Sequence, residues 1–251
     1  IKMASTRPFS KDFFIIIAGQ SIDDLFCLYA GFKVHNAKWN ESVCKVVNKS
    51  SNETFAILCP NPGEFVANIL QATISLVYPE KKNLPRIDQM TLYVDDMDGV
   101  AHCNGGSDLY TSEIHLSSKY ITSILSHHGI DDAKNELEGV IRHEMVHAVQ
   151  SNGFSTLPGG LVEGIADYFR LKGGYPSVNW KDKPKKGGKW QNGYADCAYF
   201  LAWVESTKMK DHLVVKLNQA LLRETWGDEI WKELAGADID ELFKEFNETL
   251  Q

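Results

Sequence analysis

Two neighbouring helical patterns constrain this chain more than any other feature of its sequence. The first begins at Asp131 and repeats apolar residues at spacings of three and four until Gly153 stops it. The second fits residues 161–172 and follows a short Leu-Pro-Gly-Gly reversal at residues 157–160. A reversal of this kind folds the second helix back against the first. The sequence therefore predicts a helix pair whose facing side chains meet.

The first helix carries the sequence His143-Glu144-Met145-Val146-His147. Residues four apart in an α-helix are offset by about 40° and rise about 6 Å, so both imidazoles project from one face and can bind one metal ion. The adjacent Glu144 can take a proton from a metal-bound water, whose pKa zinc lowers to about 7. Apolar neighbours indicate a half-buried helix, in which imidazole and carboxylate groups need partners. The motif predicts a zinc site.

The second helix offers the remaining ligand. A catalytic zinc site uses three protein ligands and keeps a fourth position open. Glu163 and Asp167 lie one turn apart on this helix. We expect Glu163 to be the third ligand beside His143 and His147, and Asp167 to orient His143 through its other ring nitrogen. The alternative, two ordinary surface acids, fits poorly with the apolar residues that flank them.

The remaining patterns predict an α+β fold, with a small N-terminal mixed or antiparallel sheet and a mainly helical C-terminal part. Strands are expected at residues 43–47, 53–58, 90–94 and 113–116, with a connecting loop between the last two. Further helices are expected at residues 62–77, 117–128, 193–205, 210–225 and 238–250. Residues 175–192 read as a long surface loop.

Composition narrows the choice of partners. The chain has 251 residues, 43% of them hydrophobic, and a formal net charge of −7. This acidic balance argues against nucleic acid and anionic membrane surfaces as partners. No apolar run approaches the roughly 20 residues that a membrane span needs, so no span is predicted.

Sequons and cysteines bear on the compartment. The sequence N-x-S/T occurs at Asn40, Asn48, Asn52 and Asn247, and three of these lie close together near the N-terminus. The cluster predicts a secreted, glycosylated protein.

Five cysteines exclude full pairing within one chain. In an oxidising compartment the first pair expected is Cys44 with Cys59, because a strand, a polar turn and a second strand between them would form a hairpin. The alternative is a set of buried free thiols in a reducing cytosol.

The HExxH motif followed on the next helix by ExxxD resembles the gluzincin branch of the zincin metallopeptidases. Four segments together are similar to the basic secretory protein family, peptidases of plants and bacteria; they span residues 90–101, 113–121, 139–150 and 158–170. The likeness covers residues 61–251, which we interpret as a zincin-like metallopeptidase domain. Residues 1–60 form a strand-rich extension of unknown role.

The resemblance implies a secreted, zinc-dependent endopeptidase that acts on a peptide or protein substrate with one zinc ion and with Glu144 as the base. It also implies that an edge strand holds the peptide, and it places that strand at Glu113, Ile114, His115 and Leu116. Tyr194 is the expected donor to the developing oxyanion, with a packed core tyrosine as the alternative reading; Tyr168 and Tyr175 are weaker candidates.

Two other functions remain open at this stage. One is an inactive zinc-binding secreted protein that acts by recognition, for example in defence. The other is a purely structural zinc site, which would need four protein ligands where the spacing supplies three.

Overall fold

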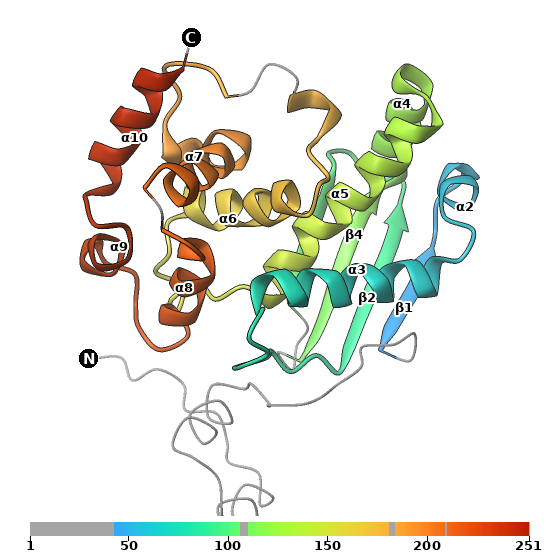
Figure 1. Cartoon of the computed structure of the whole chain (residues 1–251). Helices are drawn as coiled ribbons and strands as arrows, with labels where there is room; N and C mark the ends of the chain where they lie inside the picture. Colours follow the sequence, from blue (N-terminus) through green and yellow to red (C-terminus); the bar gives the residue numbers. More distant parts are fainter. Residues whose placement is uncertain (1–42, 106–109, 181–183, 209, 251) are drawn as a thin grey trace, which may run out of the picture.

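The computed structural model describes residues 43–105, 110–180, 184–208 and 210–250 and has the predicted α+β fold (Figure 1). A four-stranded sheet and the helices α3, α4 and α5 form one side of the molecule, and α6 to α10 form the other (Figure 1). The predicted boundary at residue 60 stays a prediction. The predicted glycosylation site at Asn40 falls outside the described residues.

The sheet is mixed. Its strands are β1 (Cys44–Asn48), β2 (Gln89–Asp95), β3 (Ala101–Gly105) and β4 (Thr111–Ser117), in the spatial order β1-β2-β4-β3. Strands β1, β2 and β4 run parallel, whereas β3 runs antiparallel to β4 and forms one edge. The side chains of Leu92 and Ile114 stand opposite each other on the core face, and neither is exposed to solvent.

Helices make up most of the described residues. They are α2 (Thr54–Leu58), α3 (Pro62–Val77), α4 (Ser118–His128), α5 (Ile130–Val149), α6 (Gly159–Lys172), α7 (Tyr194–Thr207), α8 (Leu213–Ala220), α9 (Asp228–Ala235) and α10 (Ile239–Thr249), with 3₁₀ turns at Val178–Trp180 and Trp190–Asn192. Local sequence explains several of their ends. Pro62 begins α3, where its missing N–H costs nothing. The hydroxyl of Ser117 caps α4 at its start, and Gly129, with φ of 88°, ends it.

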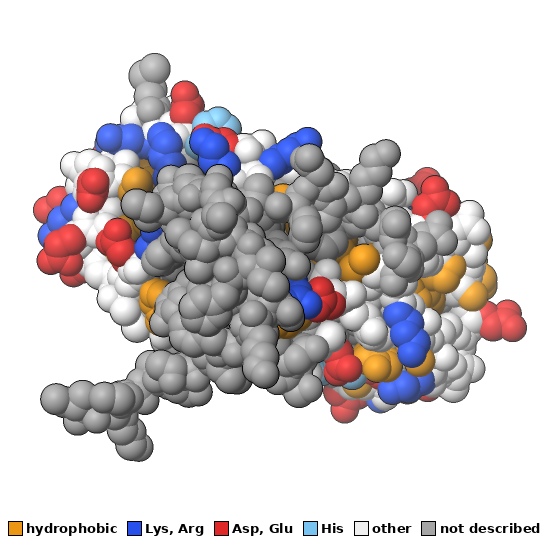
Figure 2. All heavy atoms as spheres, turned by 90° about the horizontal axis from the view of Figure 1, so that it is seen from below, with side chains coloured by type: hydrophobic (Ala, Val, Ile, Leu, Met, Phe, Trp, Pro, Cys, Tyr) orange, Lys and Arg blue, Asp and Glu red, His pale blue; other side chains and the backbone are white. Residues whose placement is uncertain are grey.

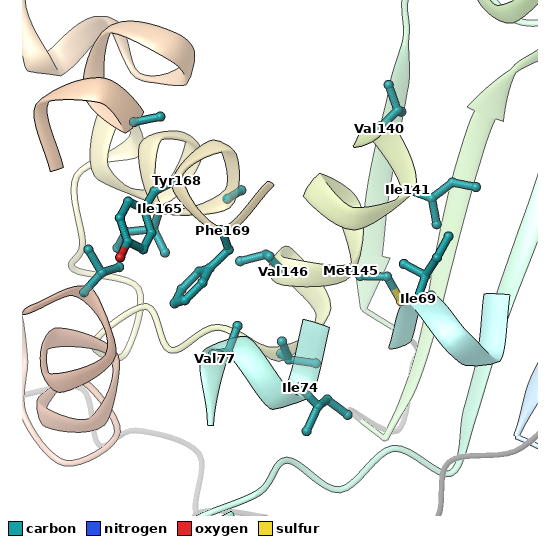
Figure 3. Close-up of a cluster of buried hydrophobic side chains, with 14 of the residues drawn as sticks. Ile69, Ile74, Val77, Val140, Ile141, Met145, Val146, Ile165, Tyr168 and Phe169 are labelled. Atoms are coloured by element: carbon teal, nitrogen blue, oxygen red, sulfur yellow. The ribbon is translucent and has the colours of Figure 1, made fainter. Parts of the chain in front are cut away.

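Helix α5 lies at the centre of the core. Figure 3 shows Ile141 and Met145 turned toward Ile69 of α3, and Val146 close to Phe169 of α6. These side chains are at most 2% exposed. Helix α5, which carries the HExxH motif, is therefore packed between α3 and the sheet on one side and α6 on another.

Three of the predicted elements differ from the structure. Residues 54–58 form the short helix α2 and not a strand, since Thr54, Phe55 and Leu58 are its buried residues, a helical spacing. The predicted loop after β2 contains β3, where Ala101 and Cys103 point inward and His102 between them points outward. Helix α8 is shorter than predicted, and α9 was missed.

The predicted disulfide between Cys44 and Cys59 is wrong. Both residues carry buried, free thiols. The prediction required a hairpin, and because residues 54–58 are helical, Cys59 follows the end of α2 and does not stand on a strand opposite Cys44. Burial raises the pKa of each thiol to about 11, which makes both unreactive at neutral pH.

The described helices contain none that is long and apolar enough to cross a membrane. Figure 2 shows basic and acidic side chains interspersed over the coloured parts of one face, without a continuous basic patch there.

Candidate metal centre

Helices α5 and α6 bring together the residues expected at the metal site. His143 and His147 project from α5, Glu163 from α6, and one ligand atom of each lies within 4.8 Å of the other two. No other group of three such residues in the described part of the chain meets this condition. The Gly- and Pro-containing reversal thus has the predicted effect, since α6 returns antiparallel to α5 with Glu163 facing the two imidazoles.

The distances within this group fit a tetrahedral metal ion. Nε2 of His143 lies 3.1 Å from Nε2 of His147 and 3.2 Å from Oε2 of Glu163, and the third pair is 3.5 Å apart. Ligands bound tetrahedrally at zinc–nitrogen and zinc–oxygen distances of about 2.0–2.1 Å stand about 3.4 Å from one another. Two imidazoles and one carboxylate also form a donor set that suits zinc. The residues present therefore fit the ion.

Two side chains hold the imidazoles from behind. Oδ1 of Asp167 lies 2.6 Å from Nδ1 of His143, and both residues are buried. The side-chain amide of Gln150 lies 2.9 Å from Nδ1 of His147. With each Nδ1 occupied, Nε2 of both rings faces Glu163.

The metal-free group is strongly coupled electrostatically. Burial opposes a charge on His143, but hydrogen bonds to Asp167 and Glu163 outweigh it and raise the pKa of His143 to about 9. Burial also opposes a charge on Glu163, yet the two imidazoles hold the pKa of this carboxyl far below its ordinary value. In the absence of a metal ion, His143 is therefore protonated at neutral pH, and a metal ion that binds there displaces this proton.

Glu144 lies beside this group and is only 6% exposed. Burial raises the pKa of its carboxyl above the ordinary value, and the nearby imidazoles oppose that rise. A carboxylate whose pKa has moved toward neutrality is suited to accept and return a proton.

Tyr194 reaches the same site from the first position of α7. Its ring is nearly parallel to that of His143, with ring centroids 6.1 Å apart. Burial and then the carboxylate of Glu163 raise its pKa, so the hydroxyl keeps its proton. Tyr194 is 55% exposed and is no packed core tyrosine.

The group lines a cleft of about 840 Å³ between the sheet side of the molecule and α6. Edge strand β3 forms one wall through residues 101–103, preceded by Val100, which is 41% exposed. Tyr194 stands at the cleft as well, whereas Tyr168 and Tyr175 are not among the residues that line it.

The predicted peptide-binding strand is misplaced. Residues 113–116 belong to β4, which is paired on both sides, with β2 and with β3. Ile114 and Leu116 are completely buried, and Glu113 and His115 point to the opposite face of the sheet. Among the described strands, the edge beside the cleft belongs to β3, so residues 113–116 lack the edge position on which their assignment to substrate depended.

Several cleft residues were missed from the sequence. On α5, Glu136 and Gln150 lie seven residues before His143 and after it, on the same face of the helix. That spacing was readable from the sequence. Arg170, Tyr120 and Trp180 also line the cleft, but they come from three other segments, and only the tertiary structure assembles them.

Comparison with known proteins identifies the family. A family model described as BSP, peptidase of plants and bacteria, matches residues 41–246. The match begins before residue 61, so it includes β1 and α2. No curated protein matches the chain, and no solved structure matches it.

Proposed function

The chain belongs to the basic secretory protein (BSP) family of plant and bacterial peptidases, and from this premise we propose that it is a zinc-dependent endopeptidase. The observation that carries the proposal is the tetrahedral spacing of His143, His147 and Glu163 at the floor of an open cleft. These three residues would hold the ion. Zinc bound there supplies Lewis acidity, which polarises a peptide carbonyl and lowers the pKa of a water molecule.

Glu144 performs the proton transfers in this proposal. Its buried carboxylate takes a proton from the attacking water and delivers it to the amine nitrogen of the leaving peptide. The raised pKa of Glu144 supports this role, because the group must hold the proton between the two steps. Asp167 keeps His143 in one ring orientation throughout.

Tyr194 stabilises the oxyanion in this proposal. A protonated hydroxyl beside the ligands can donate a hydrogen bond to the carbonyl oxygen as negative charge develops on it. The support is its position: the ring stacks over His143 at the mouth of the cleft, and the hydroxyl keeps its proton.

The substrate lies along β3 in this proposal. An extended peptide can add to the free edge of a sheet, where main-chain hydrogen bonds bind it without regard to its sequence. Among the described residues, strand β3 pairs with β4 alone, and its residues 101–103 line the cleft. Ala101 and Cys103 face α5, so the peptide would lie directly above the metal ligands.

The open side of the site argues against a structural zinc. A structural ion needs four protein ligands, and the described residues supply three. An inactive zinc-binding protein would not require a base, but here Glu144 is buried beside the ligands with a raised pKa.

The Glu144→Gln variant tests the proposal. It preserves the volume of the side chain and leaves the three ligands untouched, so we expect it to bind one zinc ion per chain, as the wild type does. Cleavage of a peptide library should fall at least about 10³-fold, since proton transfer and water activation are both lost. A variant that retains full activity would refute the mechanism.

Secretion and glycosylation belong to the same proposal, and the described sequons differ in accessibility. Asn48 is exposed, and its Oδ1 accepts from the hydroxyl of Ser50 in its own sequon. In contrast, the side chain of Asn247 accepts from the N–H of Gly187 and donates to the carbonyl of Gly188. If the protein is glycosylated, peptide mapping should find sugar on Asn48 and none on Asn247.

A further inference from the structure

A group of histidine and carboxylate side chains lies on the face of the sheet that points away from α5. Its central residue is His115 of β4, which stands directly opposite Tyr93 of β2 on one side and His102 of β3 on the other. The three rings form a stack, with centroids 4.9 Å apart between Tyr93 and His115 and 4.8 Å apart between His115 and His102. No step of the function proposed above uses these side chains.

His115 is oriented in the same way as a ligand of the catalytic centre. Oδ2 of Asp95 lies 2.7 Å from Nδ1 of His115, just as Oδ1 of Asp167 lies 2.6 Å from Nδ1 of His143. A carboxylate at one ring nitrogen fixes the direction of the other and leaves it available to a cation, an arrangement that accompanies most metal-binding histidines. Nε2 of His115 is therefore preorganised as a ligand atom.

Glu113 and His102 lie within reach of that nitrogen. Oε2 of Glu113 is 3.8 Å from Nε2 of His115, slightly more than the approximately 3.4 Å between two ligands of a tetrahedral zinc ion. The ring of His102 is exposed and lies nearly parallel to that of His115, at 6°. Since the three ligand atoms are more widely spaced than those of the catalytic centre, an ion requires the ring of His102 to turn. An exposed ring turns about its side-chain bonds within nanoseconds.

The donor set and the charge indicate which cations fit. Two imidazoles with a carboxylate suit Zn²⁺, Cu²⁺ and Ni²⁺, whereas Mg²⁺ and Ca²⁺ prefer oxygen ligands. Asp95 and Glu113 bring two negative charges to this face. Lys49 brings one positive charge, and its Nζ lies 3.9 Å from Oδ1 of Asp95. With both imidazoles neutral, the group has a net negative charge that attracts a cation.

We propose that His102, His115 and Glu113 form a second metal site, for Zn²⁺, Cu²⁺ or Ni²⁺, and that Asp95 orients His115 in it. The ion crosslinks β3 to β4 and so fixes the strand whose residues 101–103 line the cleft. Because the exposed ring of His102 must become ordered, this site fills after the catalytic centre, where the three ligands already face one another. The proposal does not depend on the peptidase function.

The test is titration of the metal-free chain with Zn²⁺, followed by calorimetry. We expect two ions to bind, the second more weakly than the first. His102→Ala should lose the second ion and keep the first, and it should fold because His102 is exposed. His128→Ala is the matched control, since it removes an exposed histidine of α4 and should keep both ions. Asp95→Asn should weaken the second site about 10- to 100-fold and leave the first unchanged.

The double variant His143→Ala/His147→Ala examines the second site without the catalytic centre. It should still bind one Zn²⁺ ion, with the affinity of the second site of the wild type. A wild type that takes up a single ion at saturating Zn²⁺, or a second ion that remains in His102→Ala, would overturn the proposal. Neither result bears on the peptidase function, which is tested by chelator-sensitive cleavage with one equivalent of zinc.

Discussion

Zinc should bind this chain more tightly as the pH rises from 7 to 9. The pKa of His143 is raised to about 9 in the metal-free site, and only the neutral imidazole binds a metal ion. At pH 7 about 1% of the molecules therefore have a neutral His143, and at pH 9 about half do. The apparent affinity should increase about 50-fold over this range, close to tenfold for the first pH unit.

The assay is competition for zinc against a chelator of known affinity at each pH. Calorimetry in buffers of different ionisation enthalpy should in addition show about one proton released from His143 at pH 7. The raised pKa of His143 also makes the stability of the metal-free fold depend on pH. Because the pKa lies above the unfolded value of 6.5, this histidine stabilises the metal-free fold below pH 6.5, and the contribution is lost as the pH rises through 9. An affinity that does not change between pH 7 and 9 would refute the reasoning.

Three further predictions concern single side chains. Asp167→Asn should weaken zinc binding about 10- to 100-fold at pH 9, where protons on His143 compete least, because the charged partner of Nδ1 is lost; unchanged affinity would argue against an orienting role. Tyr194→Phe should lower kcat about 10²-fold or more with zinc content unchanged, as expected for an oxyanion donor, whereas a purely packing role would leave kcat intact. Gly164→Ala places a Cβ 2.2 Å from Sγ of Cys197, so α6 and α7 must separate; urea unfolding should show a loss of about 1–3 kcal/mol, recovered in part by adding Cys197→Ala.

The metal site was predictable because its information is local. Two ligands lie four apart on one helix, and the third lies on the next helix across a short reversal, so helix geometry together with the reversal brings His143, His147 and Glu163 together. Asp167 was predictable for the same reason, because it lies one helical turn after Glu163. The periodicity of α5 also places Glu136 and Gln150 on the face of His143. They were missed because they lie outside the HExxH motif.

The sheet could not be predicted in the same way, because strand order depends on contacts distant in sequence. Residues 113–116 have a strand pattern, but nothing local says that β3 pairs outside them and takes the edge. The segment 54–58 is too short for its periodicity to distinguish a strand from a helix. The burial of Phe55 and Leu58 on one face favours the helix. The Cys44–Cys59 prediction failed with that assignment.

The most direct test of the central claim is chelator-dependent proteolysis by the purified chain. The account predicts that the protein with one zinc ion bound cleaves internal bonds of library peptides. It also predicts that a chelator abolishes the cleavage and that added zinc restores it, in the wild type but not in Glu144→Gln. Cleavage that survives removal of the metal, or a zinc-loaded wild type that cleaves no peptide, would contradict it.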